Sequence, residues 1–410
     1  MRLMVSFAAL FLSAILLQLG SGGIAPLDAL SGVALGFTPA QVGLLGSAHF
    51  FGFFIGCWWA PRLMGSVGAA RAFAAFTAAG TIGILAHMLV LDPHAWALMR
   101  VATGLCVAGC YTIIEAWLQA KVTNATRGRA LGVYRAVDIT GSLGAQLLIA
   151  VLEPASYVSY NLLALLCCAS LFPLTLSRLP PPETGTTPRL RPLLAWQRSP
   201  LGAAGVVVSG ITGAAFRMVG PVYGLSMGLS ADRIALFLAA YVLGGALAQV
   251  PVGWLADRFD RRHVLIWLSV ASVASCAATI WLGGLGSAAA VFLAAILFGA
   301  TTMPIYSVSA AHAHDFAAQS ERIDLSAAQL FLYALGAIAS PVLAAAIMTR
   351  YGPAGMFWMI AVAHVALVLF GVLRMLSGRR PEGRTPYEHV PRTSFLIGRL
   401  LRRGRDNGAQ

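Results

Sequence analysis

Six charged side chains that lie inside long apolar stretches of this sequence, or at their ends, are its first candidates for chemistry. They are Asp28, Arg100, Glu115, Arg135, Asp138 and Arg217. A charge within a bilayer costs about 2.5 to 3.5 kcal/mol on insertion scales, so it usually faces a cavity or a partner. A carboxylate there can exchange a proton, and an arginine can hold a carboxylate or phosphate through two parallel hydrogen bonds. These residue types therefore indicate substrate binding or proton coupling.

Asp28 and Arg217 lie toward the outer ends of two apolar stretches that an internal repeat relates to each other. Because the repeat places them at similar depths, we expect an ion pair between the two halves that closes an outer gate and can also meet a charged substrate. The alternative is that Asp28 lies in interfacial water while Arg217 extends its long side chain to the membrane surface.

Arg100 lies in the outer third of the fourth apolar stretch, one helical turn before Gly104. Its guanidinium is always charged and has a planar fork of donors, which suits binding of a substrate carboxylate or phosphate. The alternative is an ion pair or a contact with backbone carbonyls that only holds this stretch in place.

Glu115, Arg135 and Asp138 lie toward the inner side of the fourth and fifth stretches. Arg135 and Asp138 are three residues apart, so they share a helical face, and we expect the three groups to form a buried charge network. Such a network suits a structural latch, because removing one member leaves an uncompensated charge. The alternative is that Asp138 or Glu115 takes up and releases a proton as access alternates.

Neutral polar side chains within the apolar stretches are candidates for lining a cavity or for hydrogen bonds between helices. They are Tyr111, Gln146, Tyr223, Gln249, Tyr306, Gln329 and Tyr333. His49 can carry a proton near neutral pH, or it can be a hydrogen-bonded neutral imidazole. His312 and His314 do not share a helical face, and the cysteines form no metal-binding spacing, so we expect no metal and no cofactor.

The composition excludes a soluble fold. Of 410 residues, 58% are hydrophobic and only 10% are charged, against about a quarter charged in soluble domains. Runs of 18 or more mostly apolar residues predict an all-α integral membrane protein with twelve transmembrane helices. The predicted spans are 4–27, 40–61, 69–91, 94–118, 130–152, 156–177, 202–224, 232–255, 264–285, 287–310, 325–349 and 354–376.

The spans divide into two sets of six. The predicted domains are an N-terminal six-helix bundle (1–177), a cytoplasmic linker (178–200) rich in proline and arginine, a C-terminal six-helix bundle (201–376) and a basic cytoplasmic tail (377–410). The two sets also repeat, because an offset of 192 carries Gly52 onto Gly244 and an offset of 195 carries Gly104 onto Gly299. Repeats of this kind place a substrate site near the bilayer midplane between the halves.

The basic residues predict the orientation. The net charge of +13 lies in short clusters between the apolar stretches, mostly on one side, which indicates membrane topology and not nucleic-acid binding. Because cytoplasmic loops carry an excess of Lys and Arg, we expect a multi-pass protein of the inner membrane with both termini in the cytoplasm. In the tail, the apolar residues 395–397 are flanked by arginines, which suits contact with anionic membrane lipids.

The sequence GWLADRFDRR, at 253–262, resembles the G-x-L-a-D-R-x-G-R-R loop of the major facilitator superfamily. By that resemblance Asp257, Arg258, Arg261 and Arg262 form a gating loop, which locks the inner ends of the eighth and ninth spans to a neighbouring helix when the cavity opens outward. The equivalent loop of the first half lacks the acidic residue. The stretches YTIIEAWL (111–118), GPVY (220–223) and AHAHD (311–315) resemble the YcaD-like branch of the superfamily.

The resemblance implies the twelve-helix major facilitator fold and a secondary active transporter that moves a small organic solute by alternating access, with protons as the coupling ion. One alternative is an antiporter that exports drugs or other lipophilic compounds, although the fifth span lacks the proline of drug antiporters. Another is a membrane scaffold or sensor that does not transport. We expect no enzyme, because no nucleophile and base stand at a recognisable helical spacing and no phosphate-binding loop occurs.

Overall fold

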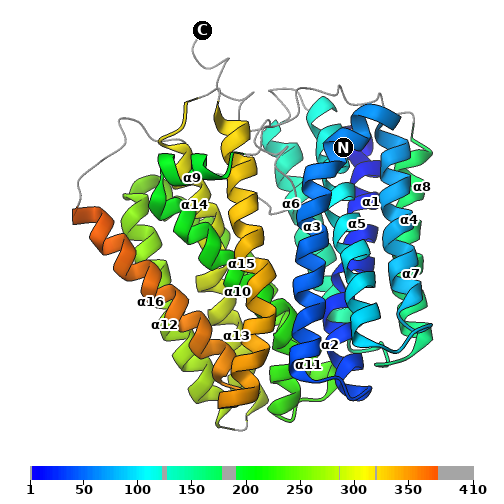
Figure 1. Cartoon of the computed structure of the whole chain (residues 1–410). Helices are drawn as coiled ribbons and strands as arrows, with labels where there is room; N and C mark the ends of the chain where they lie inside the picture. The colour runs from blue at the N-terminus through cyan, green and yellow to red at the C-terminus, as the bar shows by residue number, and fades with distance from the viewer. Residues whose placement is uncertain (1, 122–126, 178–190, 286, 319–320, 377–410) are drawn as a thin grey trace.

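The computed structural model describes residues 2–121, 127–177, 191–285, 287–318 and 321–376 (Figure 1). Within these residues the chain forms sixteen helices and no strands. This agrees with the prediction, because only helices satisfy their backbone hydrogen bonds segment by segment within lipid. The predicted tail, 377–410, lies outside the described residues.

The first half of the chain contains eight helices. They are α1 (Arg2–Gly22), α2 (Ile24–Ala34), α3 (Pro39–Val67), α4 (Ala69–Ala86), α5 (Pro93–Lys121), α6 (Arg127–Leu148), α7 (Tyr157–Ala169) and α8 (Leu171–Thr175).

The second half also contains eight helices, of which the first is a short helix within the predicted linker. They are α9 (Pro192–Arg198), α10 (Pro200–Ser226), α11 (Ala231–Arg258), α12 (Arg261–Gly283), α13 (Ala288–Thr302), α14 (Pro304–His314), α15 (Arg322–Tyr351) and α16 (Gly355–Leu376).

Three of the predicted spans are interrupted, and each interruption lies a few residues before a proline or directly before it. The breaks between α1 and α2, between α7 and α8 and between α13 and α14 lie just before Pro26, Pro173 and Pro304. Proline has no N–H to donate, and its ring clashes with the carbonyl four residues earlier. The helix therefore stops and restarts, and each pair still continues across the membrane as one span.

The twelve-helix fold is confirmed, and every predicted span overlaps a helix or a pair of helices. In the described part of the chain, eleven helical stretches are long and apolar enough to cross a bilayer. The twelfth is α6, which is 22 residues long and falls outside that set because Arg135, Asp138 and several polar residues make it less apolar. Charges in this helix are a first indication that it faces a polar cavity.

Equivalent glycines of the two halves make the same close contact. A methyl group built on Gly52 of α3 would overlap the carbonyl oxygen of Val101 on α5, and one built on Gly244 of α11 would overlap the carbonyl oxygen of Ile296 on α13. Small residues allow membrane helices to approach this closely. The internal repeat seen in the sequence is therefore a repeat of helix packing.

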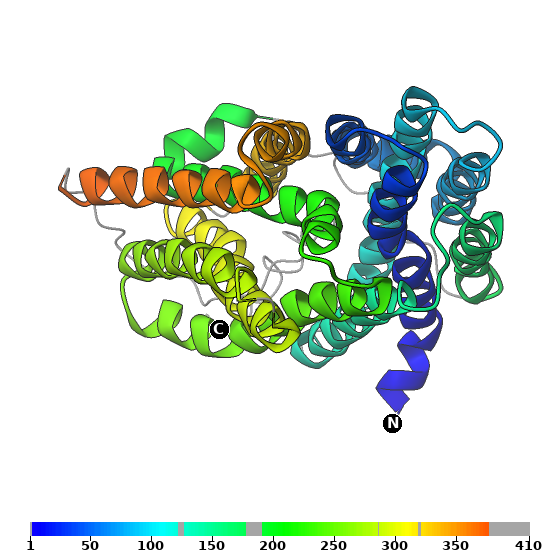
Figure 2. The same ribbon diagram turned by 90° about the horizontal axis from the view of Figure 1, so that it is seen from below.

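The helices lie in two groups, one from each half of the chain, on either side of a central region (Figures 1 and 2). The groups meet where α3 lies against α15, where α2 and α3 lie against α10, and where α6 lies against α11. The domain boundaries predicted at 177 and 201 remain predictions. The start of α1, α9 and the end of α16 lie toward one side, which is called the α9 face below.

Many large apolar side chains point away from the protein. Leu98 is 72% exposed, Val250 is 79% exposed and Val362 is 67% exposed, and each lies within a membrane-length helix. Contiguous apolar surface of this kind is rare on soluble proteins. These faces therefore suit contact with lipid tails.

Candidate functional site

A cavity of about 150 Å³ lies between the two halves and is lined by both of them. The first half contributes polar side chains from α1, α3, α5 and α6, and the second half contributes them from α10, α11, α14 and α15. These polar residues include Gln18, His49, Tyr111, Asp138, Arg217 and Gln249. Five of the six were candidates from the sequence, and the structure brings them to one place.

Asp138 and Tyr111 form the polar wall of the first half together with Gln18. The Tyr111 hydroxyl lies 3.1 Å from Asp138 Oδ1 and 2.5 Å from Gln18 Oε1. A hydroxyl has one proton, so it cannot donate to both acceptors at once. In one arrangement Asp138 is protonated and donates to the Tyr111 oxygen. In the other, the Gln18 amide is turned so that its NH₂ group donates to the Tyr111 oxygen. In the first arrangement the Asp138 carboxyl group holds an exchangeable proton, and in the second it is an ionised acceptor.

Arg217 lines the same cavity from α10, and its side chain is exposed there. Among the described residues it makes no hydrogen bond, and no carboxylate lies within the 4.0 Å of an ion pair. It is close enough to Asp138 and His49 to interact with them electrostatically. A guanidinium within a membrane helix and without an anion is costly, so this position suits an anionic group of a bound solute.

His49 and Tyr306, two further candidates, differ in their access to the cavity. His49 lines it, is 8% exposed and has its Nδ1 3.4 Å from the Thr103 hydroxyl, which fits a hydrogen-bonded imidazole. Tyr306 is not among the lining residues; it packs behind Tyr333, with ring centroids 5.6 Å apart. Gln249 lines the cavity from α11.

The expected pairing of Asp28 with Arg217 is not what the structure contains. Asp28 is fully buried within the first half, where Oδ2 lies 3.3 Å from Nε of Arg100 and 3.5 Å from Nε2 of His87. The Tyr160 hydroxyl donates to its Oδ1 at 2.8 Å. Asp28 and Arg217 lie at similar depths in the membrane, but their side chains do not face each other. Arg217 points into the cavity, whereas Asp28 points away from it.

Arg100 is accordingly held by an ion pair. It is 2% exposed and is not among the residues that line the cavity. Of the two interpretations from the sequence, this geometry fits the one in which Arg100 holds the fourth span in place. Trp96, one turn earlier on α5, also contacts this group of residues, because its ring NH donates to the backbone carbonyl of His87 at 2.7 Å.

The predicted network of Glu115, Arg135 and Asp138 is also divided. Glu115 is fully buried and accepts a hydrogen bond from the Tyr134 hydroxyl at 3.5 Å. Asp138 instead faces the cavity and bonds to Tyr111, and it forms no ion pair with Arg135. A spacing of three residues placed Arg135 and Asp138 on one helical side, but it did not pair them, because the Asp138 carboxylate lies beside Tyr111.

The gating loop ties together the ends of three helices of the second half on the α9 face. Arg261 is 2% exposed and bonds to Asp257 at 3.2 Å and to Asp315 at 2.7 Å. Its Nη1 also donates to the backbone carbonyl of Ala311 at 3.1 Å. Arg261 thus ties the ends of α11 and α12 to the end of α14 beside Asp315; the role of this loop as a gate remains a prediction. Arg258 lies over the ring of Trp254, 5.3 Å from its centroid.

Asp260 caps the start of α12 within the same loop. Its Oδ1 accepts from the backbone N–H of Arg262 at 3.0 Å, and its Oδ2 lies 2.8 Å from the Arg262 guanidinium. Partial burial acts to raise the pKa of Asp260, but the bonds from Arg262 outweigh it and lower the pKa to about 2. The side chain is therefore ionised at physiological pH.

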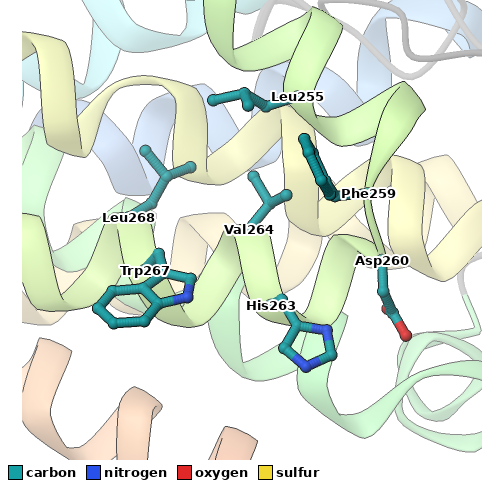
Figure 3. Close-up of a pocket in the computed structure, with 7 residues that line it drawn as sticks. All are labelled: Leu255, Phe259, Asp260, His263, Val264, Trp267 and Leu268. Atoms are coloured by element: carbon teal, nitrogen blue, oxygen red, sulfur yellow. The ribbon is translucent and has the colours of Figure 1, made fainter.

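A second hollow lies at the junction of α11 and α12 and differs in character from the central cavity. Figure 3 shows its apolar wall, with Leu255 and Phe259 on one side and Val264, Trp267 and Leu268 on the other. Its volume is about 660 Å³, and Trp267 is 69% exposed. This open, apolar groove lacks the convergent polar groups that give the central cavity its specificity.

The sequence reasoning missed three residues of these clusters: Gln18, His87 and Tyr160. Gln18 is the one amide in an otherwise apolar first span, and a lone polar group of this kind was a usable signal. No role was assigned to His87 or to Tyr160 from the sequence. Their roles depend on Asp28, which lies far from both along the chain, so no local spacing indicated them.

Three comparisons bear on the family. The family model of the Major Facilitator Superfamily matches residues 202–405. A curated relative, the uncharacterized MFS-type transporter YE1530 of Yersinia enterocolitica, is 27% identical over 85% of this chain and 89% of its own length. YcaD of Escherichia fergusonii, also described as an uncharacterized MFS-type transporter, is 27% identical with the same coverage.

The fold resembles that of solved transporters. The crystal structure of the nucleoside transporter NupG matches with a TM-score of 0.73, covering 91% of this chain and 99% of that one at 15% identity. This likeness concerns the fold alone. Together with the loop at 253–262, the repeated helix packing and the cavity between the halves, the comparisons show that the chain belongs to the major facilitator superfamily, with YcaD among its relatives.

Proposed function

We propose that this protein is a secondary active transporter that moves a small organic solute by alternating access and couples this movement to protons. It is not an enzyme in this proposal, and it lies in the inner membrane with both termini in the cytoplasm. The observation that carries the proposal is the cavity of about 150 Å³ lined by charged and polar groups from both halves. A site divided in this way can open to either side when one half rocks on the other.

The contacts between the halves suggest which state this structure represents. On α3 they begin near the end far from the α9 face, where a methyl group on Gly43 would lie 2.6 Å from the carbonyl oxygen of Pro341. They continue to the middle of the helix, where the rings of Phe54 and Phe331 lie 5.3 Å apart. The closed side is the predicted outer side, so we infer a state that faces the cytoplasm.

Proton coupling is assigned to Asp138. It faces Tyr111 of α5, Gln18 of α1, Arg217 of α10 and His49 of α3 around one cavity. Movement of the halves changes the distance between Asp138 and Arg217, which belong to different halves. Because a nearby cation favours the ionised carboxylate, this movement would change the proton affinity of Asp138 from one state to the other.

Two alternatives to this proposal are less well supported. Drug-sized ligands occupy pockets of about 300 to 1,000 Å³, so a cavity of about 150 Å³ favours a smaller and more polar solute than an efflux antiporter for lipophilic drugs would carry. A non-transporting scaffold or sensor has no need of an exposed guanidinium in the membrane interior. Only the absence of any flux would support that alternative.

The test is transport by the purified protein in liposomes that contain a pH-sensitive dye. Amino acids, organic acids, sugars and nucleosides would be added singly, and we expect at least one to cause proton movement across the membrane. Asp138→Asn should abolish this movement, whereas Glu115→Gln, which alters a buried carboxylate outside the cavity lining, should retain it. Transport that kept the same pH dependence in both variants would exclude coupling through Asp138.

A further inference from the structure

Two opposite charges face the central cavity from different halves without pairing with each other. Asp138 lies on α6 of the first half and Arg217 on α10 of the second. Neither belongs to an ion pair among the described residues. If they were only structural, direct pairing would be the cheapest way to compensate both charges. The space between them is therefore available to a solute that carries both charges itself.

We propose, on the basis of the transport function above, that the cavity binds a compact zwitterion with a carboxylate and an ammonium group, as in a small neutral amino acid. The carboxylate contacts the Arg217 guanidinium, and the ammonium contacts the Asp138 carboxylate. A solute with one charge would leave the other protein group uncompensated.

The Arg217 end of the site suits a carboxylate. The guanidinium presents a planar fork of donors that matches the two oxygens of a carboxylate, and such charge-assisted pairs are roughly twice as strong as neutral hydrogen bonds. Its exposure to the cavity and the absence of a described partner leave those donors available. A purely cationic solute would be repelled from this end.

The Asp138 end suits an ammonium group. Ionised Asp138 has two acceptor oxygens and no donor, and its Oδ1 lies 3.1 Å from the Tyr111 hydroxyl. An ammonium has three donors and no acceptor, so it matches this group of acceptors. When the ammonium group of the solute binds, it takes the place of a proton on Asp138. The solute and the proton therefore compete for this carboxylate.

The rest of the cavity limits the solute's size and the nature of its side chain. Apolar residues complete the lining, including Phe50, Phe53, Val107 and Val242. The cavity volume of about 150 Å³ lies below the range of about 300 to 1,000 Å³ for pockets that hold drug-sized ligands. A short, uncharged side chain fits beside these residues, whereas a long or charged one does not.

The first experiment measures binding by thermal unfolding in detergent. The panel would contain the proteinogenic amino acids and, for each one that binds, its deaminated acid, its decarboxylated amine and an uncharged amide of similar size. We expect one or more small neutral amino acids to raise the Tm and their singly charged and uncharged analogues to have a much smaller effect. Binding of an analogue as tightly as the amino acid, or no amino acid hit in a folded sample, would overturn the proposal.

The second experiment assigns the charges to their partners. Arg217→Gln and Asp138→Asn should each raise the Kd of the bound amino acid by about 10- to 100-fold, the range expected for one lost hydrogen bond to a charged group. Arg217→Gln should also remove the preference for the amino acid over its decarboxylated amine. Arg233→Gln and Glu153→Gln, at exposed positions outside the cavity, are matched controls that should leave the Kd unchanged.

A flux measurement separates this inference from the transport proposal. Amino acid binding without any flux would refute the transporter and leave the site intact. Flux of a solute that is not a zwitterion, unchanged in Arg217→Gln, would refute the site and leave the transporter intact.

Discussion

Replacing Asp28 should strongly destabilise the first half of this protein. Its side chain is fully buried, with Arg100 at 3.3 Å, His87 at 3.5 Å and Tyr160 at 2.8 Å. In Asp28→Asn the Arg100 guanidinium keeps its charge but loses the compensating anion. Breaking a buried pair in this way costs about 3 to 5 kcal/mol.

The expected change in Tm follows from that energy. A loss of 1 kcal/mol lowers the Tm by about 2 to 4 °C for a unit of 150 to 250 residues, so Asp28→Asn should lower it by roughly 6 to 20 °C. Tyr160→Phe removes one donor to the same carboxylate and should cost less, about 1.5 to 3 kcal/mol. Five of the six cysteines are buried, so a thiol-reactive fluorescent dye reports unfolding in detergent without an added label.

The control and the double variant make this reasoning refutable. Glu153→Gln changes an exposed carboxylate of the same half and should leave the Tm within a degree or two. Asp28→Asn combined with Arg100→Gln should be more stable than Asp28→Asn alone, because no unpaired charge remains. If Asp28→Asn behaved like the control, or if the two substitutions simply added, the buried pair would not stabilise the fold as described.

Three further predictions concern helix packing and the loop on the α9 face. Gly52→Ala should lower the free energy of unfolding by about 1 to 3 kcal/mol, because the new methyl group overlaps a backbone carbonyl. The control Gly65→Ala should not, because its methyl group meets nothing within 4 Å. Expression level and Tm measure both effects. Asp260→Asn should lower the free energy of unfolding by about 1 kcal/mol after allowance for solvent screening. Because the pKa of Asp260 in the folded protein is depressed to about 2, this contribution is present at pH 5 to 7 and is lost as the pH falls from about 4 toward 2. If the wild type and the variant were already equally stable at pH 5, the prediction would be wrong. Arg261→Met should lower the Tm by several degrees, because it removes the ion pair between Arg261 and the buried Asp315 carboxylate, and the exposed Arg258→Met should not.

The helices were predictable because whether a segment spans the membrane depends on its own length and hydropathy. Apolar length alone placed all twelve, including α6, whose charges weaken the apolar pattern but do not shorten the helix. The interruptions before Pro26 and Pro304 also have local causes, although the sequence reasoning did not use them. The glycine contacts of α3 and α11 follow from the repeat, because equivalent sequence positions pack in equivalent ways.

The site was predictable only in part. Tyr111, Asp138 and Arg217 were identified as rare polar groups in apolar spans, and the structure gathers them around one cavity. Gln18 completes that wall from a helix far away in the chain and was overlooked. Tyr306 was a reasonable candidate by its residue type, but it packs against Tyr333 and is not among the residues that line the cavity.

The sequence by itself determined the number of spans, their repeat and the charges that the membrane interior has to accommodate, because hydropathy and residue spacing act locally. Only the tertiary structure decided which charges meet. Asp28 pairs with Arg100 inside one half, and Arg217 is left to face Asp138 across the cavity. The physical reason is that depth in the membrane follows from position along a helix, whereas a partner follows from the rotation and packing of several helices together.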